Sequence, residues 1–171
     1  MLFVMVFEEA VVMPPSYLGP ELQSILKAKL IEKVEGSCTE KYGYIVCVLK
    51  VEEISSGKIL DTSGDVLFNI KYRAVILKPF VNEVLDGVIE KVDKYGTSVS
   101  VGPIQIFISN KNFHPEFEYN DSSNTYVSTK QNEKLAPDVE VRFRVIGTKF
   151  DSNKIVGTGV MNEDYLGPFR T

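Results

Sequence analysis

The sequence has no tryptophan, a single histidine and only two cysteines among its 171 residues. An enzyme needs a nucleophile with a base, a paired acid and base, a set of metal ligands or a phosphate-binding loop. His114 is far in sequence from Cys38 and Cys47, and no glycine-rich phosphate loop, HExxH or GxSxG element occurs. Carboxylates are numerous, but no spacing singles out a pair. The sequence therefore predicts no catalytic residue, no metal site and no cofactor.

Long apolar runs and an excess of positive charge are also absent. No window approaches the roughly 18 to 20 apolar residues of a membrane span, and residues 1–15 lack the basic start and cleavage site of a signal peptide. With 19 basic and 23 acidic residues, the net charge is −4. We therefore expect a protein of the cytoplasm or nucleus, without membrane contact and with reduced thiols. Any RNA contact must be local or strengthened by a partner.

The first part of the chain has the pattern of an α+β domain. Residues 2–12 are typical of a buried strand, which Pro14 and Pro15 end. Residues 16–36 indicate a helix, with Gly19 as a cap, Pro20 in the first turn and Gly36 just beyond the end. Its apolar face at helical spacing consists of Leu22, Ile25, Leu26, Leu30 and Val34.

Further strands are predicted over residues 42–51 and 66–76, with a possible one over 54–60. The strand over 66–76 alternates, so one face should be buried and the other exposed. The expected buried side chains are Val66, Phe68, Ile70, Tyr72, Ala74 and Ile76, and the expected exposed ones are Asn69, Lys71 and Arg73.

After Pro79 the pattern changes to short strands separated by turns. Strands are predicted over residues 83–93, 95–102, 104–109, 138–148 and 154–161. Five strands with a long insertion after the third are typical of an all-β barrel of the OB type. The polar insertion, residues 115–136, is expected to be mobile. Its Tyr119 and Tyr126 could contact RNA or pack on their own barrel.

The outer face of such a barrel is where bases could stack and cations could meet phosphate. Tyr95, beside Gly96 at a strand corner, is expected to be exposed, whereas Phe107 could face the core or the solvent. Arg142 and Arg144 alternate with Val141, Phe143 and Val145 and should point outward. Lys149 and Lys154 are also available from the last two strands.

The stretch "VLDGVIEKVDKYGTSVSVGPIQIFIS" resembles the RNA-binding barrel domain named after ribosomal protein S-one. The resemblance aligns Tyr95 with a stacking aromatic, Phe107 with a strand-three site residue, and Asp151 and Lys154 with an acidic and basic pair. Ser98 stands where a second aromatic is usual and cannot stack. The platform is thus only partly present, which predicts weak RNA binding.

Four colinear stretches resemble the family of larger stalk subunits of RNA polymerase II and, more distantly, their counterpart in archaeal RNA polymerase: "PSYLGPELQSILKAKLIEKVEGSC", "YGYIVCVL", "FNIKYRAVILKPFVNEVLDGVI" and "EDYLGP". The resemblance implies a truncated ribonucleoprotein-like domain over residues 1–80 and an RNA-binding barrel over 81–171. It further implies a nuclear, non-catalytic polymerase subunit, a smaller helical stalk subunit as partner, docking near the clamp of the polymerase core, and contact with nascent single-stranded RNA. The docking residues it implies are Pro14, Pro15, Tyr17, Leu18, Gly19, Lys58, Ile59, Leu60 and Gly64.

Two other functions stay open at this point. The chain could be a free single-stranded RNA-binding module acting in translation or RNA decay, or its barrel could serve purely as a scaffold for protein contacts.

Overall fold

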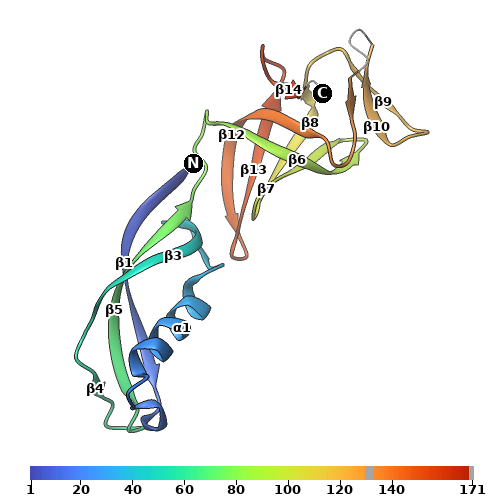
Figure 1. Ribbon diagram of the computed structural model, residues 1–171. Coiled ribbons are helices and arrows are strands. Elements are labelled where there is room, and N and C mark those ends of the chain that lie inside the picture. Colours follow the sequence, from blue (N-terminus) through green and yellow to red (C-terminus); the bar gives the residue numbers. More distant parts are fainter. Residues whose placement is uncertain (130–132, 170–171) are drawn as a thin grey trace. The chain divides into compact units, whose positions relative to one another are not determined.

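The computed structural model describes residues 1–129 and 133–169 and consists of two compact units. Leu2–Lys78 form the N-terminal domain, and the residues from Pro79 onward, together with Met1, form the barrel domain (Figure 1). The expected order, an α+β domain followed by an all-β barrel, is confirmed. Within the described residues, no helix has the length and apolar character needed to cross a membrane.

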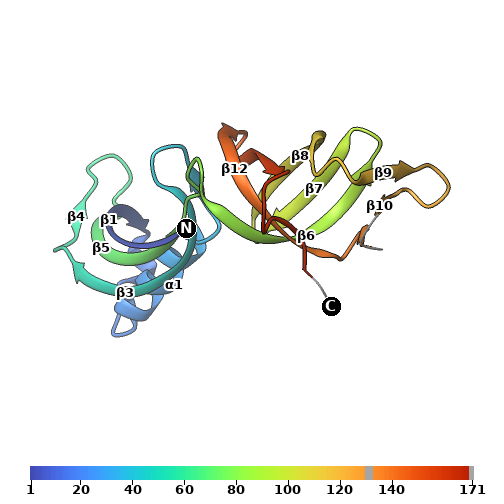
Figure 2. The ribbon, with the colours of Figure 1, turned by 90° about the horizontal axis from the view of Figure 1, so that it is seen from above.

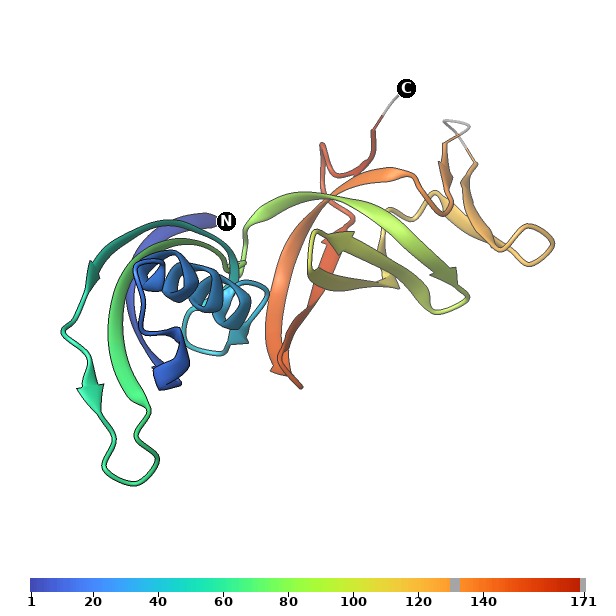
Figure 3. The same cartoon turned by 60° about the horizontal axis from the view of Figure 1, so that its bottom comes forward.

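The N-terminal domain is an antiparallel sheet with a single helix on one face. The strand order is β1-β5-β3-β2, and β4 pairs with the start of β5. Figure 3 shows α1 lying against the concave face of this sheet. The alternation predicted for β5 is confirmed, with all six expected side chains buried and all three expected ones exposed. The elements are β1 (Leu2–Met13), a 3-10 turn η1 (Pro15–Tyr17), α1 (Leu22–Val34), β2 (Cys38–Thr39), β3 (Gly43–Ile54), β4 (Lys58–Ile59) and β5 (Val66–Leu77).

Helix α1 packs through the predicted apolar face, with Leu26, Leu30 and Val34 buried. Its end is also as predicted, because Gly36 follows it in the left-handed conformation at φ 77°. The predicted start is wrong. Leu22 N donates to Gly19 O and closes a turn, so Pro20 precedes the helix and Glu21 is the N-cap residue.

The prediction that β1 is a buried strand is wrong. Val11 and Met13 lie in the core, but Leu2, Val4 and Val6 are 60%, 57% and 48% exposed. The reason is position: β1 is at the edge of the sheet, and α1 covers only one of the two sheet faces. An apolar strand pattern does not distinguish an edge strand from a central one.

The barrel domain closes on itself through five long strands. The order is β13-β8-β7-β6-β12, and β12 pairs back with β13, which runs parallel to β8. Val141, Phe143 and Val145 fill the interior at 0% exposure, as predicted. The strands are β6 (Val84–Asp93), β7 (Gly96–Val101), β8 (Ile104–Phe113), β12 (Glu140–Asp151) and β13 (Lys154–Met161), with the short β14 (Gly167–Pro168) beside β12.

The insertion between β8 and β12 was expected to be mobile, yet it carries regular structure. It forms a small antiparallel sheet of β9 (Phe117–Asn120), β10 (Thr125–Ser128) and β11 (Lys134–Leu135), part of which is visible beside the barrel in Figure 2. Tyr126 is only 3% exposed and meets Phe113 edge-on at 4.8 Å. An apolar anchor of this kind holds the insertion on the barrel, and it settles Tyr126 as a packing residue.

Candidate nucleic-acid interface

The corner between β6 and β7 holds Tyr95 in a fixed, outward position. The buried Tyr126 hydroxyl donates to Asp93 O and Lys94 O, both at 3.0 Å. Asn110 donates its backbone N–H to Tyr95 O at 2.9 Å and its side-chain amide to Lys94 O at 3.3 Å. Burial, with smaller effects of Tyr119 and Asp93, raises the pKa of Tyr126, so its hydroxyl stays a neutral donor. Tyr95 is 72% exposed, as expected from the sequence.

Phe107 points outward from the barrel wall. Its neighbours Ile106 and Ile108 are fully buried, whereas Phe107 is 39% exposed, so the strand alternation places its ring on the outer face. The register puts Ser98 on one side of it and Thr158 on the other. An aromatic ring between two short polar side chains has room for a base to stack.

Gly96 lies directly beneath this ring. A Cβ at position 96 would be 2.9 Å from Phe107 Cζ and would overlap the carbonyl oxygen of Ile108. The residue also has φ 155°. The Tyr-Gly pair of the sequence motif therefore does two things: it displays Tyr95 and gives the Phe107 ring a flat surface on which to rest.

Lys154 and Asp151 are exposed and directly opposite each other at the β12–β13 hairpin. This hairpin lies beside the start of β8, whereas the Tyr95 corner lies beside the middle of that strand, at Ser109 and Asn110. Gly96 pairs with Ser109, whereas Val156, two residues after Lys154, pairs with Gln105. Lys154 and Gly96 are thus about six residues apart along β8, which at about 3.3 Å per residue is roughly 20 Å. Tyr95, Phe107 and Lys154 thus form a stripe, which we call the stacking stripe, rather than a compact cluster.

Arg142 and Arg144 face outward as predicted, but they lie apart from the stacking stripe. The register connects Phe107 through Thr158 to Gly147 on β12, not to the arginines. Arg142 forms a bidentate pair with Asp86 at 2.6 and 2.9 Å, and Arg144 Nη2 contacts Glu163 at 2.8 Å. The structure therefore does not bring these two guanidiniums together with the rings of Tyr95 and Phe107.

The Arg142–Asp86 pair makes a pH-dependent contribution to stability. The hydrogen bond from Arg142 holds the pKa of Asp86 below its ordinary value. A lowered pKa in the folded state means that the stabilisation is present above the ordinary carboxyl pKa and is lost as the pH falls through the folded value. We expect Asp86→Asn to lower the urea midpoint slightly at pH 7, and by progressively less as the pH falls below the ordinary carboxyl pKa. Asp93→Asn, which removes a carboxylate 2.9 Å from Lys91, is the control; an equal pH-dependent loss there would contradict the assignment.

Sequence reasoning missed Lys91. Its side chain is 70% exposed, and the register places it next to Ser98, in the same row as Phe107. A β-bulge between Ile89 and Lys91 shifts the alternation of β6. The signal in the sequence is the spacing of the buried Ile89 and Val92, three residues apart rather than two.

The implied docking residues come together at one end of the N-terminal sheet. Val66 on β5 pairs with Met13, just before the Pro14–Gly19 loop, and with Ile59 on β4. The Pro14–Gly19 loop and the segment around β4 therefore lie on either side of the start of β5. Tyr17, Leu18 and Ile59 are 49%, 47% and 65% exposed. The remaining implied residues of these loops are Pro14, Pro15, Gly19, Lys58, Leu60 and Gly64, of which Gly64 has φ 73° in the turn to β5.

Comparison with known proteins identifies both domains. Residues 8–64 match the family described as "SHS2 domain found in N terminus of Rpb7p/Rpc25p/MJ0397", and residues 78–158 match the S1 RNA binding domain. The chain is 38% identical over 169 residues to DNA-directed RNA polymerase II subunit rpb7 of Dictyostelium discoideum, covering 98% of each chain. It is 37% identical to the subunits of that name from Schizosaccharomyces pombe, covering 90% of each chain, and Saccharomyces cerevisiae, covering 98% of this chain and 99% of that one.

The chain is therefore a two-domain protein in which an SHS2 domain precedes an S1 barrel. It belongs to the Rpb7 family of RNA polymerase II subunits, which confirms the resemblance noted in the sequence.

Proposed function

We propose that this protein is a non-catalytic subunit of nuclear RNA polymerase II that forms a stalk with a smaller subunit and contacts the emerging transcript. The observation that carries the proposal is the identity of 37–38% to Rpb7 proteins across both domains. We also propose that the two functional domains divide near residue 80, that the partner is a smaller subunit and that the stalk lies near the clamp.

The N-terminal domain docks through the end formed by Tyr17, Leu18 and Ile59. Exposed apolar side chains on loops rich in Pro and Gly suit a partner that approaches the backbone closely. If the docking contacts exist in the closed state of the clamp and are lost in the open one, docking shifts the clamp towards closure. That shift is limited to the difference in contact free energy between the two states.

The barrel guides RNA through the stacking stripe. A net charge of −4 and two stacking aromatics support weak rather than tight binding. Weak affinity is adequate for a transcript held at the polymerase, because tethering gives the RNA a high effective concentration.

Affinity purification of the tagged chain followed by mass spectrometry tests the proposal. We expect polymerase II subunits with the wild-type chain. The variant Leu18→Ala, Ile59→Glu should recover at least about tenfold less polymerase core, since each tenfold corresponds to about 1.4 kcal/mol of lost contact. Recovery of the smaller subunit should not change, because the substitutions lie only at the docking end. Leu49→Ala, an exposed leucine on β3 at 54%, is the matched control.

If the chain were instead a free RNA-binding module, the purification would give the opposite result. Purification would then recover no polymerase, and the isolated chain would bind single-stranded RNA tightly with a steep dependence on salt. A barrel that serves only as a scaffold would associate with polymerase but not crosslink to transcript.

A further inference from the structure

The barrel domain has a cavity of about 510 Å³. Three parts of the domain line it. Arg142 comes from β12, Phe117 and Glu133 come from the insertion, and Asp164 and Tyr165 come from the segment that leads into β14. The register separates Arg142 from the stacking stripe, so the cavity is a different surface from the one proposed to contact RNA.

Hydrogen bonds and buried anchors fix both sides of the cavity. On one side, β14 pairs with β12, and Phe169 donates its backbone N–H to Glu140 O at 3.0 Å. On the other side, Tyr126 and Leu135 anchor the insertion at 3% and 0% exposure. The cavity is therefore formed before a ligand arrives, and binding costs little ordering of the chain.

The lining combines aromatic rings with an excess of negative charge. Among the described lining residues, Arg142 is the only one with a permanent positive charge. The described residues include no group of three ligating side chains that could hold a metal ion. Rings beside dispersed carboxylates favour an organic cation instead, because ring faces and carboxylates both attract it. The rings are Phe117, Tyr165 and Phe169, and the carboxylates are Glu116, Glu133, Glu163 and Asp164.

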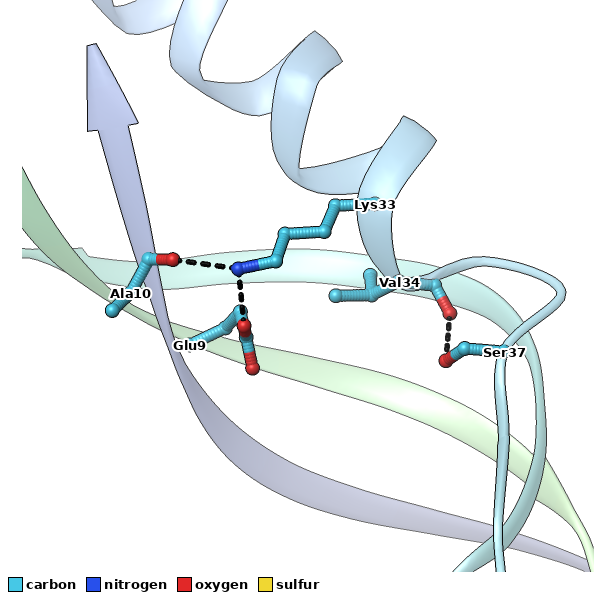
Figure 4. Close-up of polar contacts among 5 residues, drawn as sticks. All are labelled: Glu9, Ala10, Lys33, Val34 and Ser37. Atoms are coloured by element: carbon cyan, nitrogen blue, oxygen red, sulfur yellow. Dashed lines mark hydrogen bonds and ion pairs between the residues drawn. The ribbon is translucent and has the colours of Figure 1, made fainter. Parts of the chain in front are cut away.

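Two places in the chain show that such surroundings hold a basic side chain. The guanidinium carbon of Arg142 lies 5.0 Å from the centroid of the Phe169 ring while its nitrogens bind Asp86. In the N-terminal domain, a cavity lined by three aromatic rings also contains Lys33, whose Nζ lies 2.6 Å from Glu9, as Figure 4 shows. In both places the chain itself supplies the cation.

Tyr165 and Asp164 have no such cation from the described part of the chain. Tyr165 lines the cavity, yet it is 97% exposed. Its backbone is in the left-handed region at φ 67°, which is rare for a bulky residue and is often kept where a ligand is bound. The neighbouring Asp164 is exposed and forms no ion pair with a described residue. A ring face and a carboxylate are therefore presented together to the solvent.

We propose that the cavity binds an arginine side chain of a partner protein, with the guanidinium stacked on Tyr165 and hydrogen-bonded to Asp164. Arginine suits the site better than lysine, because its planar group stacks on a ring and presents several N–H donors in one plane. Tyrosine and arginine are also the residues on which affinity between proteins often depends. The inference goes beyond the proposed function and depends on neither the RNA contact nor the docking end.

NMR titration of the isotope-labelled full chain with the blocked tripeptide Ala-Arg-Ala tests the proposal. We expect saturable changes in the backbone amide signals of Phe117, Asp164 and Tyr165. The same tripeptide with citrulline, which keeps the shape of arginine and loses its charge, should bind at least about tenfold more weakly. The tripeptide with lysine should also bind more weakly than the arginine peptide. Equal binding of either substitute would overturn the proposal.

The variant Asp164→Asn, Tyr165→Ala removes both groups that the proposal uses. We expect it to weaken the arginine tripeptide at least about tenfold, with the melting temperature of the chain preserved because both side chains are exposed. Asp121→Asn is the matched control, since Asp121 is an exposed carboxylate in the turn between β9 and β10, outside the cavity. Wild-type binding by the double variant would rule out the site.

Two other occupants are distinguished by the same measurement. Changes at the same three amide signals on addition of oligouridylate would mean that the cavity binds RNA, which would overturn the proposal. Arg170 directly follows the cavity residue Phe169 in sequence. If Arg170→Gln raised the affinity for the arginine tripeptide at least about tenfold, the chain's own arginine would be the occupant, and the proposal would again be wrong.

Discussion

Replacing Gly96 by alanine should destabilise the barrel domain by at least about 3 kcal/mol, a loss large enough to need a specific mechanism. The added Cβ would overlap the carbonyl oxygen of Ile108 and lie 2.9 Å from Phe107 Cζ. The first of these atoms belongs to the backbone of β8, which pairs with β7 at this position, so it cannot move without breaking the ladder. The backbone at φ 155° adds strain for any residue with a side chain.

Calorimetry of the full chain measures this effect. For a unit of fewer than 100 residues, each 1 kcal/mol corresponds to about 4–8 °C, so the transition of the barrel domain should fall by more than about 12 °C. Gly147→Ala is the matched control, because a Cβ there would meet only Thr158 Oγ1 at an ordinary 3.7 Å. A Gly96→Ala chain that melts like the control would mean that the β7–β8 pairing is looser than described.

The sequence was most informative where its pattern had a clear period. The alternation of residues 66–76 and the helical spacing from Leu22 to Val34 each predicted a buried face correctly. Residues 2–7 are uninterruptedly apolar, so they have no period from which a face could be assigned. Their exposure depends on β1 being an edge strand, which only the order of strands in the sheet determines.

The candidate RNA surface was also predictable only in part from the sequence. The motif around Tyr95 predicted an exposed aromatic at a corner, and the structure has it. The outward side of Phe107 could not be assigned because apolar residues flank it on both sides. The partners of the arginines could not be predicted from the sequence either. Asp86 is 56 residues from Arg142 in sequence, and pairing of this kind depends on which strands become neighbours.

The second large effect is expected on RNA contact. In the assembled polymerase, the variant Tyr95→Ala, Phe107→Ala should crosslink to nascent transcript at least about tenfold less than the wild type. Each stacked base is worth about 1–3 kcal/mol, and each 1.4 kcal/mol is a factor of about ten. Both rings are exposed, at 72% and 39%, and neither contributes to the buried core. The variant should therefore keep the stability of the barrel and its association with polymerase.

Tyr165→Ala is the matched control for this experiment. Tyr165 is 97% exposed and belongs to the same domain, but it lies in the segment between β13 and β14, outside the stacking stripe. Removal of the Tyr165 ring should leave crosslinking unchanged. We expect RNA contact to require a position within the stacking stripe, and exposure of a ring elsewhere is not enough. Undiminished crosslinking of the double variant would exclude stacking on Tyr95 and Phe107. Equal losses in the double variant and the control would instead indicate diffuse contact with exposed aromatics, since a net charge of −4 offers little electrostatic attraction for RNA.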